Sequence, residues 1–419
     1  MSARLLAIFG SGETAPTMTK HHRDLLSRTA DGPRVMLDTP YGFQENADDI
    51  SARAVEYFER SLQTQVAVAS VRNADIDPVA LAGAQAKITA ASWVFTGPGS
   101  PSYALRQWAN TSIPAVIIDK LRTGGTVIFS SAAALTLGTR TVPVYEVYKV
   151  GSTPYWLEGL DIVGALTGLR AVVIPHFDNA EGGNHDTRFC YLGERRLSAL
   201  EVALDPDEFI LGVDEHTGLV LDLDAGTASV VGKGGVTMRA GGESEVLGAG
   251  TTVGIEALRP GAGRRGAAPA RSVANEASSL EGGVGEIAAA TLGDAVTAAE
   301  RVFSEAIAAR NVESAVAAVL GLEQSIDEWS ADTTQSPDGD RARATLRSMV
   351  VRLGDLATRG ARDPRDVLGP LVALVLDARR GARERKDWAA SDQIRDGLAA
   401  AGIDVRDTRD GVEWDIATE

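Results

Sequence analysis

Cysteine is almost absent from this sequence, because Cys190 is the only one in 419 residues. A single thiol excludes an intrachain disulfide framework, and this scarcity fits a reducing compartment. Positive charge is also scarce, since 41 Lys and Arg residues stand against 57 Asp and Glu residues, a formal net charge of -16. That balance argues against non-specific binding of polyanions by the whole chain, because such binding needs an excess of cations.

Long hydrophobic runs are missing as well. The first apolar run, residues 5–9, is short and stops at Gly10-Ser11-Gly12. It is too short for the core of a signal peptide or for a membrane span. We therefore expect a cytoplasmic protein with no membrane partner. The hydrophobic content of 44% is ordinary for a globular chain, and the length allows two or three domains.

Short β-branched runs alternate with helical patterns in the first part of the chain. The runs predict strands at residues 4–9, 34–38, 64–70, 92–96, 126–130, 171–175 and 210–213. Helical patterns between them lie at residues 51–61, 78–90 and 102–109. A strand followed by a helix, repeated, is typical of one parallel sheet covered by helices on both faces. Such sheets bind ligands at the carboxyl ends of their strands, so we expect functional residues there.

The composition changes at residues 259–285, which are rich in Gly, Ala, Pro, Arg and Ser and lack any periodicity. This is the composition of a flexible linker. After it, apolar residues at helical spacing predict helices at 286–310, 312–330, 340–359, 364–386 and 388–401, and then a small hairpin at 403–416 that turns at residues 410–411. We therefore predict an α/β domain over 1–258, a linker over 259–285, and a helical domain with a small αββ tail over 286–419.

Ser131 follows one of the predicted strands and precedes a run of small residues that ends at Gly138. A serine at such a turn can expose its hydroxyl as a nucleophile, with nearby helix amides to receive an oxyanion. The same residues also suit a plain helix start. Gly97 and Gly99 follow another strand and could supply further amides. Alternatively, they form a tight loop before a helix that Ser100 or Ser102 caps.

No nucleotide cofactor is expected. The loop after the first strand, residues 10–14, has two glycines but lacks the third glycine of the dinucleotide fingerprint.

Polar residues gather in the segment 174–188, which holds His176 and His185. His176 directly follows a strand, where a general base would stand, although a histidine that is merely hydrogen-bonded in a loop fits equally. Together with Asp178 and Asp186, the two histidines could instead ligate a metal, but no helical His-x-x-x-His spacing supports that alternative. Asp214 and Glu215 follow a further strand, where a carboxylate could orient an imidazole.

These motifs give residues 1–258 a resemblance to the cyanophycinase and dipeptidase E family of serine peptidases. The matching segments, in family order, are Thr96-Gly97-Pro98, Phe129-Ser-Ser131-Ala-Ala-Ala134, Pro175-His-Phe177, His185-Asp-Thr-Arg188 and Gly212-Val-Asp-Glu215-His-Thr217. The resemblance implies the class I glutamine-amidotransferase-like, flavodoxin-like fold. It also implies Ser131 as nucleophile, His176 as general base and Glu215 as the acid that orients it.

The same resemblance assigns the oxyanion amides to Gly97 and Ala132, with Gly99 as a replacement. It also suggests Arg188 as the reader of a substrate carboxylate, with His185 beside it. Three residues depart from the family pattern. Phe129 and Ala133 stand where the family has glycines on either side of the nucleophile, and Pro98 replaces a glycine and has no N–H to donate. A changed substrate and a non-catalytic domain both fit these departures.

The C-terminal region resembles the helical, anticodon-binding region of cysteinyl-tRNA synthetases. The match is specific over residues 384–416, through Arg385-Lys-Asp387-Trp388, Ser391-Asp392-Gln-Ile394-Arg395-Asp396, Asp407-Thr408, Gly411 and Trp414. The sequence has no His-Ile-Gly-His or Lys-Met-Ser-Lys-Ser segment and no thiolate-rich zinc site. We therefore do not expect a working synthetase.

Five cations fall within eight residues of this region: Arg379, Arg380, Arg383, Arg385 and Lys386. They could contact a few phosphates of an RNA, or they could simply form a solvated helix end. The sequence therefore favours a serine-dependent hydrolase of peptide or amide bonds, without a metal or other cofactor, that acts on a small peptide or amide. The alternative is a non-catalytic tRNA-binding or adaptor protein.

Overall fold

The computed structural model describes residues 3–181, 185–261, 291–309, 311–330, 338–360, 364–408 and 411–417. Its contacts divide the chain into two compact units, residues 1–299 with 320–343 and residues 300–319 with 344–419. Most of the predicted linker, residues 262–285, lies outside the described residues, and the domain limits drawn from the sequence stay predictions. Within these described ranges, no helix is long and apolar enough to cross a membrane.

An eight-stranded sheet forms the centre of the α/β part, with the strand order β14-β11-β10-β1-β5-β4-β2-β3. Five strands pair in parallel: β1 (Arg4–Phe9), β2 (Arg34–Leu37), β3 (Ala67–Ala69), β4 (Trp93–Thr96) and β5 (Gly125–Ser130). Three strands extend the sheet in antiparallel fashion: β10 (Thr217–Asp222), β11 (Thr227–Gly232) and β14 (Thr252–Gly254). The sequence predicted the parallel strands but not this antiparallel extension.

A second, four-stranded sheet has the order β13-β12-β9-β8. It contains β8 (Ala171–Ile174), β9 (Phe209–Val213), β12 (Gly235–Ala240) and β13 (Glu243–Gly248). The expectation of one sheet was wrong, because β8 and β9 pair with each other here and not with β5. The chain changes sheets over residues 214–216. The amide of Asp214 still donates to Gly235 beside β9, whereas Thr217 accepts from Gly10 and continues the pairing of β10 with β1. A short pair, β6 (Arg140–Thr141) and β7 (Leu157–Glu158), completes the strands of this part.

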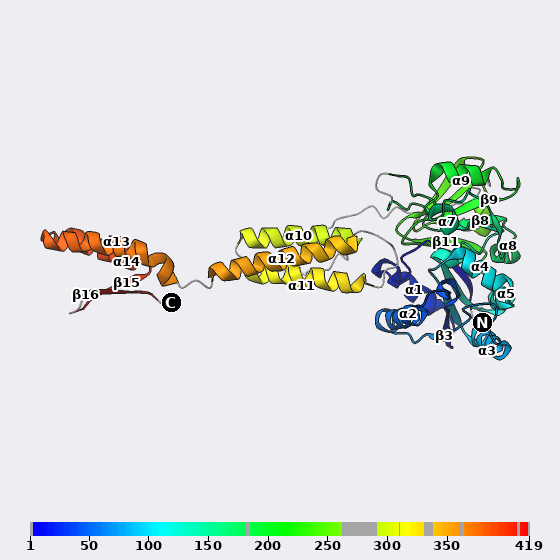
Figure 1. Cartoon of the computed structure of the whole chain (residues 1–419), viewed down its shortest axis with the longest axis horizontal. Helices are drawn as coiled ribbons and strands as arrows, with labels where there is room; N and C mark the ends of the chain where they lie inside the picture. The colour runs from blue at the N-terminus through cyan, green and yellow to red at the C-terminus, as the bar shows by residue number, and fades with distance from the viewer. Residues whose placement is uncertain are drawn as a thin grey trace. The chain divides into compact units, whose positions relative to one another are not determined.

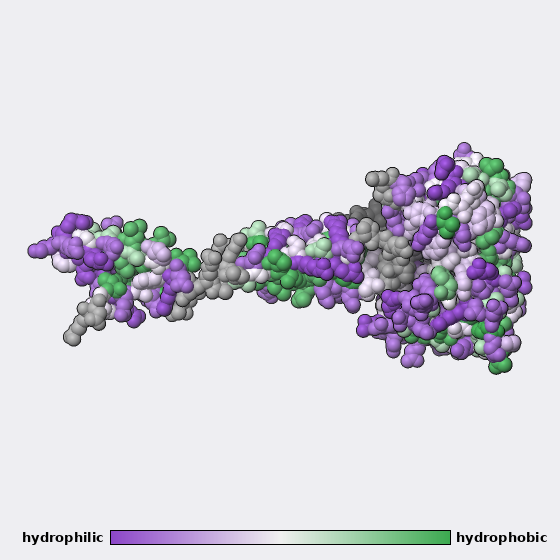
Figure 2. All heavy atoms as spheres, viewed as in Figure 1, coloured by the Kyte–Doolittle hydropathy of each residue, from purple (hydrophilic) through white to green (hydrophobic). Residues whose placement is uncertain are grey.

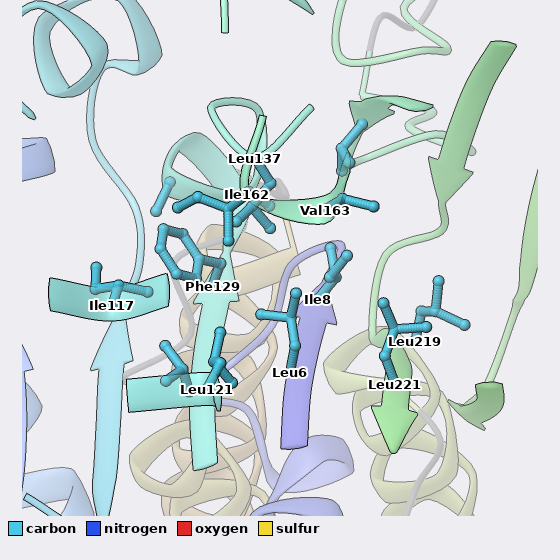
Figure 3. Close-up of a cluster of buried hydrophobic side chains, with 14 of the residues drawn as sticks. Leu6, Ile8, Ile117, Leu121, Phe129, Leu137, Ile162, Val163, Leu219 and Leu221 are labelled. Carbon is cyan, nitrogen blue, oxygen red and sulfur yellow. The ribbon is translucent and has the colours of Figure 1, made fainter. Parts of the chain in front are cut away.

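Helices pack on both faces of the eight-stranded sheet. On one face lie α1 (Pro16–Arg28) and α2 (Ala47–Leu62), and on the other lie α3 (Pro78–Ala90), α4 (Pro101–Ala109), α5 (Ile113–Thr123), α6 (Ser131–Ala134) and α8 (Ile162–Thr167) (Figure 1). Helices α7 (Val144–Tyr148) and α9 (Gly193–Glu201) pack on the four-stranded sheet, and 3-10 turns lie at Thr39–Tyr41 and Ile255–Leu258. Strand β1 alternates between two cores: Leu6 and Ile8 join one apolar cluster, while Leu5 and Phe9 join the other. Figure 3 shows the first cluster, where Ile117 of α5 lies near Phe129. Burial on both faces explains why the parallel strands have continuous apolar sequences.

Three helices follow in the helical part: α10 (Leu292–Ala308), α11 (Val312–Glu328) and α12 (Asp338–Gly360). Polar contacts link α10 with α12, since Arg341 donates to Thr297 and Thr345 donates to Glu300. Apolar side chains are also exposed on α11 and α12, and Figure 2 shows such hydrophobic patches among hydrophilic ones. The predicted helices are confirmed here, although residues 286–290 and 310 lie outside the described residues.

The last elements are α13 (Pro364–Glu384), α14 (Trp388–Ala400), β15 (Ile403–Thr408) and β16 (Gly411–Ile416). They enclose a small core of Val372, Leu376, Leu398 and Ile403, against which Trp414 packs. The two strands pair in antiparallel register from Ile403 with Ile416 to Thr408 with Gly411. The predicted order, an α/β part followed by helices and an αββ tail, is therefore confirmed.

Candidate active site

Ser131 stands at a sharp turn between β5 and α6. Its φ of +50° lies in the left-handed region, which is unfavourable for a residue with a side chain. Such a conformation persists only where the surrounding structure enforces it, and it is common at functional sites. The preceding strand is fully buried, whereas Ser131 itself is partly accessible. The turn therefore presents the serine at the carboxyl end of β5.

Three side chains form a continuous chain of hydrogen bonds at this turn. Ser131 Oγ lies 2.9 Å from His176 Nε2, and His176 Nδ1 lies 2.7 Å from Glu215 Oε1. Because a carboxylate only accepts, the Nδ1–H donates to Glu215 and Nε2 is left to accept from the serine hydroxyl. His176 follows β8 and Glu215 follows β9, so the two sheets meet at this site. The arrangement matches that of a nucleophile, a base and an orienting acid.

The electrostatic environment of His176 favours its protonated form. Burial opposes the charge of the imidazole, but the hydrogen bond and the negative charge of Glu215 outweigh it, so the pKa of His176 is raised above 6.5. Burial also opposes the charge of Glu215, yet its hydrogen bond with His176 holds the pKa of the carboxyl below its ordinary value. Asn179 Nδ2 donates to the same carboxylate oxygen at 3.1 Å. The pair is therefore built to hold a proton on the imidazole once the serine releases it.

The predicted oxyanion loop lies against the serine turn. The amide of Ala133 donates to the carbonyl of Gly97 at 3.2 Å, which ties the loop to α6. Gly99 has a φ of +145°, and a Cβ there would lie 2.1 Å from the Pro40 carbonyl oxygen, so only glycine fits. Among the described residues, the backbone amides of Gly97, Gly99 and Ala132 have no hydrogen-bond acceptor. Their role in an oxyanion hole stays a prediction.

Phe129, the bulky residue that stands where the family has a glycine, does not obstruct Ser131. Its side chain is 0% exposed and packs edge-on against Trp108, with ring centroids 5.9 Å apart. In Figure 3 it lies in the apolar cluster on one face of the sheet. Ala133 is buried in the same cluster. Phe129 therefore belongs to the core, and the hydroxyl of Ser131 keeps its contact with His176.

Arg188 is occupied by neighbouring carboxylates. Its guanidinium donates to both oxygens of Asp186 at 2.9 Å and lies 3.9 Å from Glu194. The hydrogen bond from Arg188 holds the pKa of Asp186 well below its usual range. His185 stacks on the ring of Tyr148. The reading of a substrate carboxylate by Arg188 and His185 stays a prediction, and the arginine is already paired with Asp186.

Sequence reasoning did not single out several polar residues of this site. Glu13 is 0% exposed, and its Oε2 accepts a hydrogen bond from Ser130 Oγ at 2.7 Å. Asn179 and Glu181 belong to the loop after His176, and Tyr191 OH donates to Glu181 Oε2 at 2.7 Å. The two glycines beside Glu13 are visible in the sequence, but nothing in it indicates that this loop lies against Ser130.

The alternative of a metal site receives no support from geometry. In the part of the chain that the structure describes, no group of three or more His, Cys, Asp or Glu residues is arranged to hold a metal ion.

The five C-terminal cations do not form one open patch. Arg379 is 3% exposed and donates to both oxygens of Asp407 at 2.8 Å, and Arg383 contacts the same carboxylate at 2.9 Å. The hydrogen bond from Arg379 lowers the pKa of Asp407 to about 2. Arg380 pairs with Asp377 on its own helix. Arg385 and Lys386 are exposed and have no ion-pair partner within the described ranges, so they are the cations open to a ligand.

Comparison with known proteins finds a family for the C-terminal end of the chain. Residues 366–414 match the sequence model of the cysteinyl-tRNA ligase anticodon binding domain. The cysteine–tRNA ligase of Arthrobacter sp. (strain FB24) is 46% identical over 85 residues, which are 19% of this chain and 18% of that protein. The cysteine–tRNA ligase of Streptomyces coelicolor is 41% identical over 98 residues, 21% of this chain and 16% of that protein. The predicted resemblance is confirmed for this region, and the chain spans less than a fifth of the length of these relatives.

Two solved structures are similar to another part of the chain. A peptidase from an acI-B1 Actinobacterium is 20% identical with a TM-score of 0.48, and the match covers 60% of this chain and 97% of that one. A putative peptidase E protein from Listeria monocytogenes EGD-e is 12% identical with a TM-score of 0.37, covering 59% of this chain and 99% of that one.

Proposed function

We propose that the α/β part is a serine-dependent hydrolase of peptide or amide bonds. The observation that carries the proposal is the hydrogen-bonded chain from Ser131 through His176 to Glu215. The left-handed backbone at Ser131 supports it, because strain of this kind at a partly accessible serine is typical of a nucleophile. The burial of Phe129 also supports it, because this bulky side chain lies in the core and does not obstruct Ser131.

The reaction follows from the roles of the three side chains. Ser131 Oγ attacks the carbonyl carbon of the amide while its proton passes to His176 Nε2, and Glu215 stabilises the resulting imidazolium. His176 then gives this proton to the leaving amine as the carbon–nitrogen bond breaks. A water molecule, deprotonated by the same imidazole, releases the acyl group and restores the serine. The amides of Gly97 and Ala132, or of Gly99, stabilise the oxyanion, and Pro98 contributes no donor.

The test is mass spectrometry of the intact protein after exposure to a fluorophosphonate probe, which labels activated serines. The wild-type protein is expected to gain a single adduct, and the Ser131→Ala and His176→Ala variants are expected to gain none. Ser27→Ala, which removes an exposed hydroxyl on α1, serves as the matched control and keeps the adduct. A folded wild-type protein that gains no adduct at Ser131 contradicts the proposal.

A second function is supported by the match of residues 366–414 to an anticodon-binding domain. We propose that this region contacts tRNA, and that Arg385 and Lys386 supply phosphate contacts, because these two cations have no ion-pair partner among the described residues. This contact also underlies the alternative of a non-catalytic tRNA-binding or adaptor protein. The full chain is titrated with tRNA over a range of salt concentrations. The double variant R385Q/K386Q is expected to weaken binding. It is also expected to reduce the slope of log binding constant against log salt concentration by the amount that corresponds to about two phosphate contacts.

A further inference from the structure

We propose that Asn179 is a positioning residue, which holds the carboxylate of Glu215 in place and through it orients the imidazole of His176. This inference rests on the proposed hydrolase function and adds a fourth member to its hydrogen-bonded chain. It concerns how the acid and the base are held, and not which substrate they act on.

Glu215 is the acid of the site, and its side chain needs an anchor. A glutamate has one more rotatable bond than an aspartate, so it loses more conformational freedom when it is fixed in one rotamer. The hydrogen bond from His176 Nδ1 ends on Oε1 of this carboxylate at 2.7 Å. A single contact leaves the carboxylate free to turn about it, whereas a second donor fixes its direction.

Asn179 supplies that second donor. Its Nδ2 donates to the same Glu215 Oε1 at 3.1 Å, and its Oδ1 accepts from the backbone amide of Glu181 at 3.3 Å. Because a carboxylate only accepts and a backbone amide only donates, the side-chain amide of Asn179 can take only this orientation. The residue is 0% exposed, so both contacts are shielded from solvent.

The loop that carries Asn179 also holds the backbone around Glu215. The amide of Phe177 donates to the carbonyl of Val213 at 3.1 Å, and the amide of Glu215 donates to Asp178 Oδ1 at 2.7 Å. Together with the Asn179 contact, these bonds continue the parallel pairing of β8 with β9 beyond the ends of both strands. The acid is therefore fixed to the loop after β8 through its backbone and through its carboxylate.

Asn179 contacts the base as well. Its backbone amide donates to the carbonyl of His176 at 3.2 Å, and the amide of Cys190 donates to the same carbonyl at 3.0 Å. His176 has a φ of +49°, which a residue with a side chain adopts only where its surroundings enforce it. One residue thus contacts the acid through its side chain and the base through its backbone, and it sets their relative position.

Asn179 is uncharged, although charged and titratable groups surround the acid and the base. These groups come from the loops after β1, β8 and β9, and they are Glu13, Asp178, Glu181, Cys190, Tyr191, Asp214 and His216. Replacing Asn179 with alanine leaves all of them in place. The variant therefore tests the position of the Glu215 carboxylate and not the charge around it.

The experiment compares the rate and the pH profile of fluorophosphonate labelling of Ser131. In Asn179→Ala the carboxylate of Glu215 is held less firmly against His176 Nδ1. The labelling rate at pH 8 is expected to fall by about tenfold, which corresponds to the loss of one hydrogen bond to a charged group. The midpoint of the profile is expected to move to lower pH, because the imidazolium is less well stabilised.

Further variants separate positioning from damage to the fold. Asn179→Asp keeps an acceptor for the Glu181 amide and replaces only the donor toward Glu215. Its rate at pH 8 is expected to fall at least as far, because two carboxylates repel each other. The double variant Glu215→Gln/Asn179→Ala is expected to label within about twofold of Glu215→Gln, since the charged acid that Asn179 positions is already gone. Asn110→Ala removes an exposed asparagine and is the matched control, which keeps the wild-type rate and midpoint.

The outcomes distinguish this inference from the proposed function. If wild-type Ser131 is labelled and both Asn179 variants label at the wild-type rate, positioning by Asn179 is wrong and the hydrolase stands. If Asn179→Ala slows labelling equally with and without Glu215→Gln, Asn179 supports only the fold and the inference is overturned. A midpoint that rises in Asn179→Ala also overturns it, because the amide then only weakens the charge of Glu215. If wild-type Ser131 is not labelled at all, the hydrolase proposal fails, and positioning by Asn179 fails with it.

Discussion

At the scale of single residues, the proposed chemistry depends on the proton that His176 accepts. The imidazole must be neutral to take a proton from Ser131, and its pKa lies above 6.5 because Glu215 overcomes the effect of burial. The base is therefore protonated and inactive at low pH, and the rate of fluorophosphonate labelling is expected to rise with pH through a midpoint above 6.5. A labelling rate that is flat between pH 5 and 9 would contradict this.

Replacing Glu215 tests the source of that shift. Glu215→Gln removes the charge opposite Nδ1, so the midpoint of labelling is expected to move to lower pH and the rate at pH 8 to fall by about 10³-fold. The two effects together separate electrostatics from misfolding, because a misfolded variant loses rate without a defined shift in its midpoint. The measurement is the pH profile of labelling for the variant beside that of the wild type.

Glu13 is expected to act on the reaction through other residues. Its buried carboxylate accepts from Ser130, the neighbour of the nucleophile, and its charge favours the protonated imidazole of His176. Glu13→Gln keeps an acceptor for Ser130 and removes the charge. The midpoint of the labelling profile is therefore expected to fall by less than about one pH unit. Glu243→Gln removes the same charge from an exposed position on β13, so it is the control and should leave the midpoint unchanged. If the midpoint is also unchanged in Glu13→Gln, Glu13 has only a structural role.

At the scale of elements, α1 contributes a buried histidine to the core rather than to the site. His22 is 0% exposed, lies among rings that include Phe9, Phe58 and Phe95, and hydrogen-bonds through Nε2 to the carbonyl of Glu13. Because that carbonyl can only accept, His22 carries a proton on Nε2, and burial favours the neutral form of the ring. Burial lowers its pKa from 6.5 to about 4.

This histidine makes the stability of the fold sensitive to acid. Between pH 6.5 and about 4 the unfolded chain binds a proton at His22 that the folded protein does not bind. The contribution of His22 to the free energy of unfolding is therefore fully present above pH 6.5. It is lost as the pH drops toward 4, and the loss is on the order of 3 kcal/mol. The free energy of unfolding, measured by urea unfolding at a series of pH values, is expected to depend less steeply on pH in His22→Gln than in the wild type. His185→Gln, which removes an exposed histidine, is the control. An equal slope in wild type and His22→Gln would exclude this origin.

The elements also show what the sequence could and could not predict. Strands β1, β2, β4, β5, β8 and β9 were predicted within about a residue of their limits, because burial on both faces leaves a continuous apolar run. Strands β10 to β13 were missed, although each has six residues, because polar residues and glycines interrupt their apolar positions, as in β13 (Glu243–Gly248). Ser131, His176 and Glu215 were found because each follows a strand. Asn179, Glu181 and Tyr191 were not, because loop residues gain their positions from tertiary contacts, including a left-handed stretch from Phe189 to Tyr191.

At the scale of the whole molecule, the chain carries two kinds of candidate site that share no residue. The serine site belongs to residues 1–258, and the region similar to an anticodon-binding domain begins at residue 366. The net charge of -16 gives tRNA no general attraction to the chain, so any binding must come from local cations such as Arg385 and Lys386. We therefore expect the two activities to be lost separately.

That separation is tested by crossing the variants of each site. Ser131→Ala is expected to lose fluorophosphonate labelling and to bind tRNA with an affinity within about twofold of the wild type, because it leaves the C-terminal cations unchanged. R385Q/K386Q is expected to do the reverse, with weaker tRNA binding and an unchanged labelling rate. Saturating tRNA added to the wild type shows whether the sites are coupled, since a coupling free energy would change the labelling rate. An unchanged labelling rate means that the chain joins two independent activities. A change that R385Q/K386Q abolishes means that tRNA regulates the serine site.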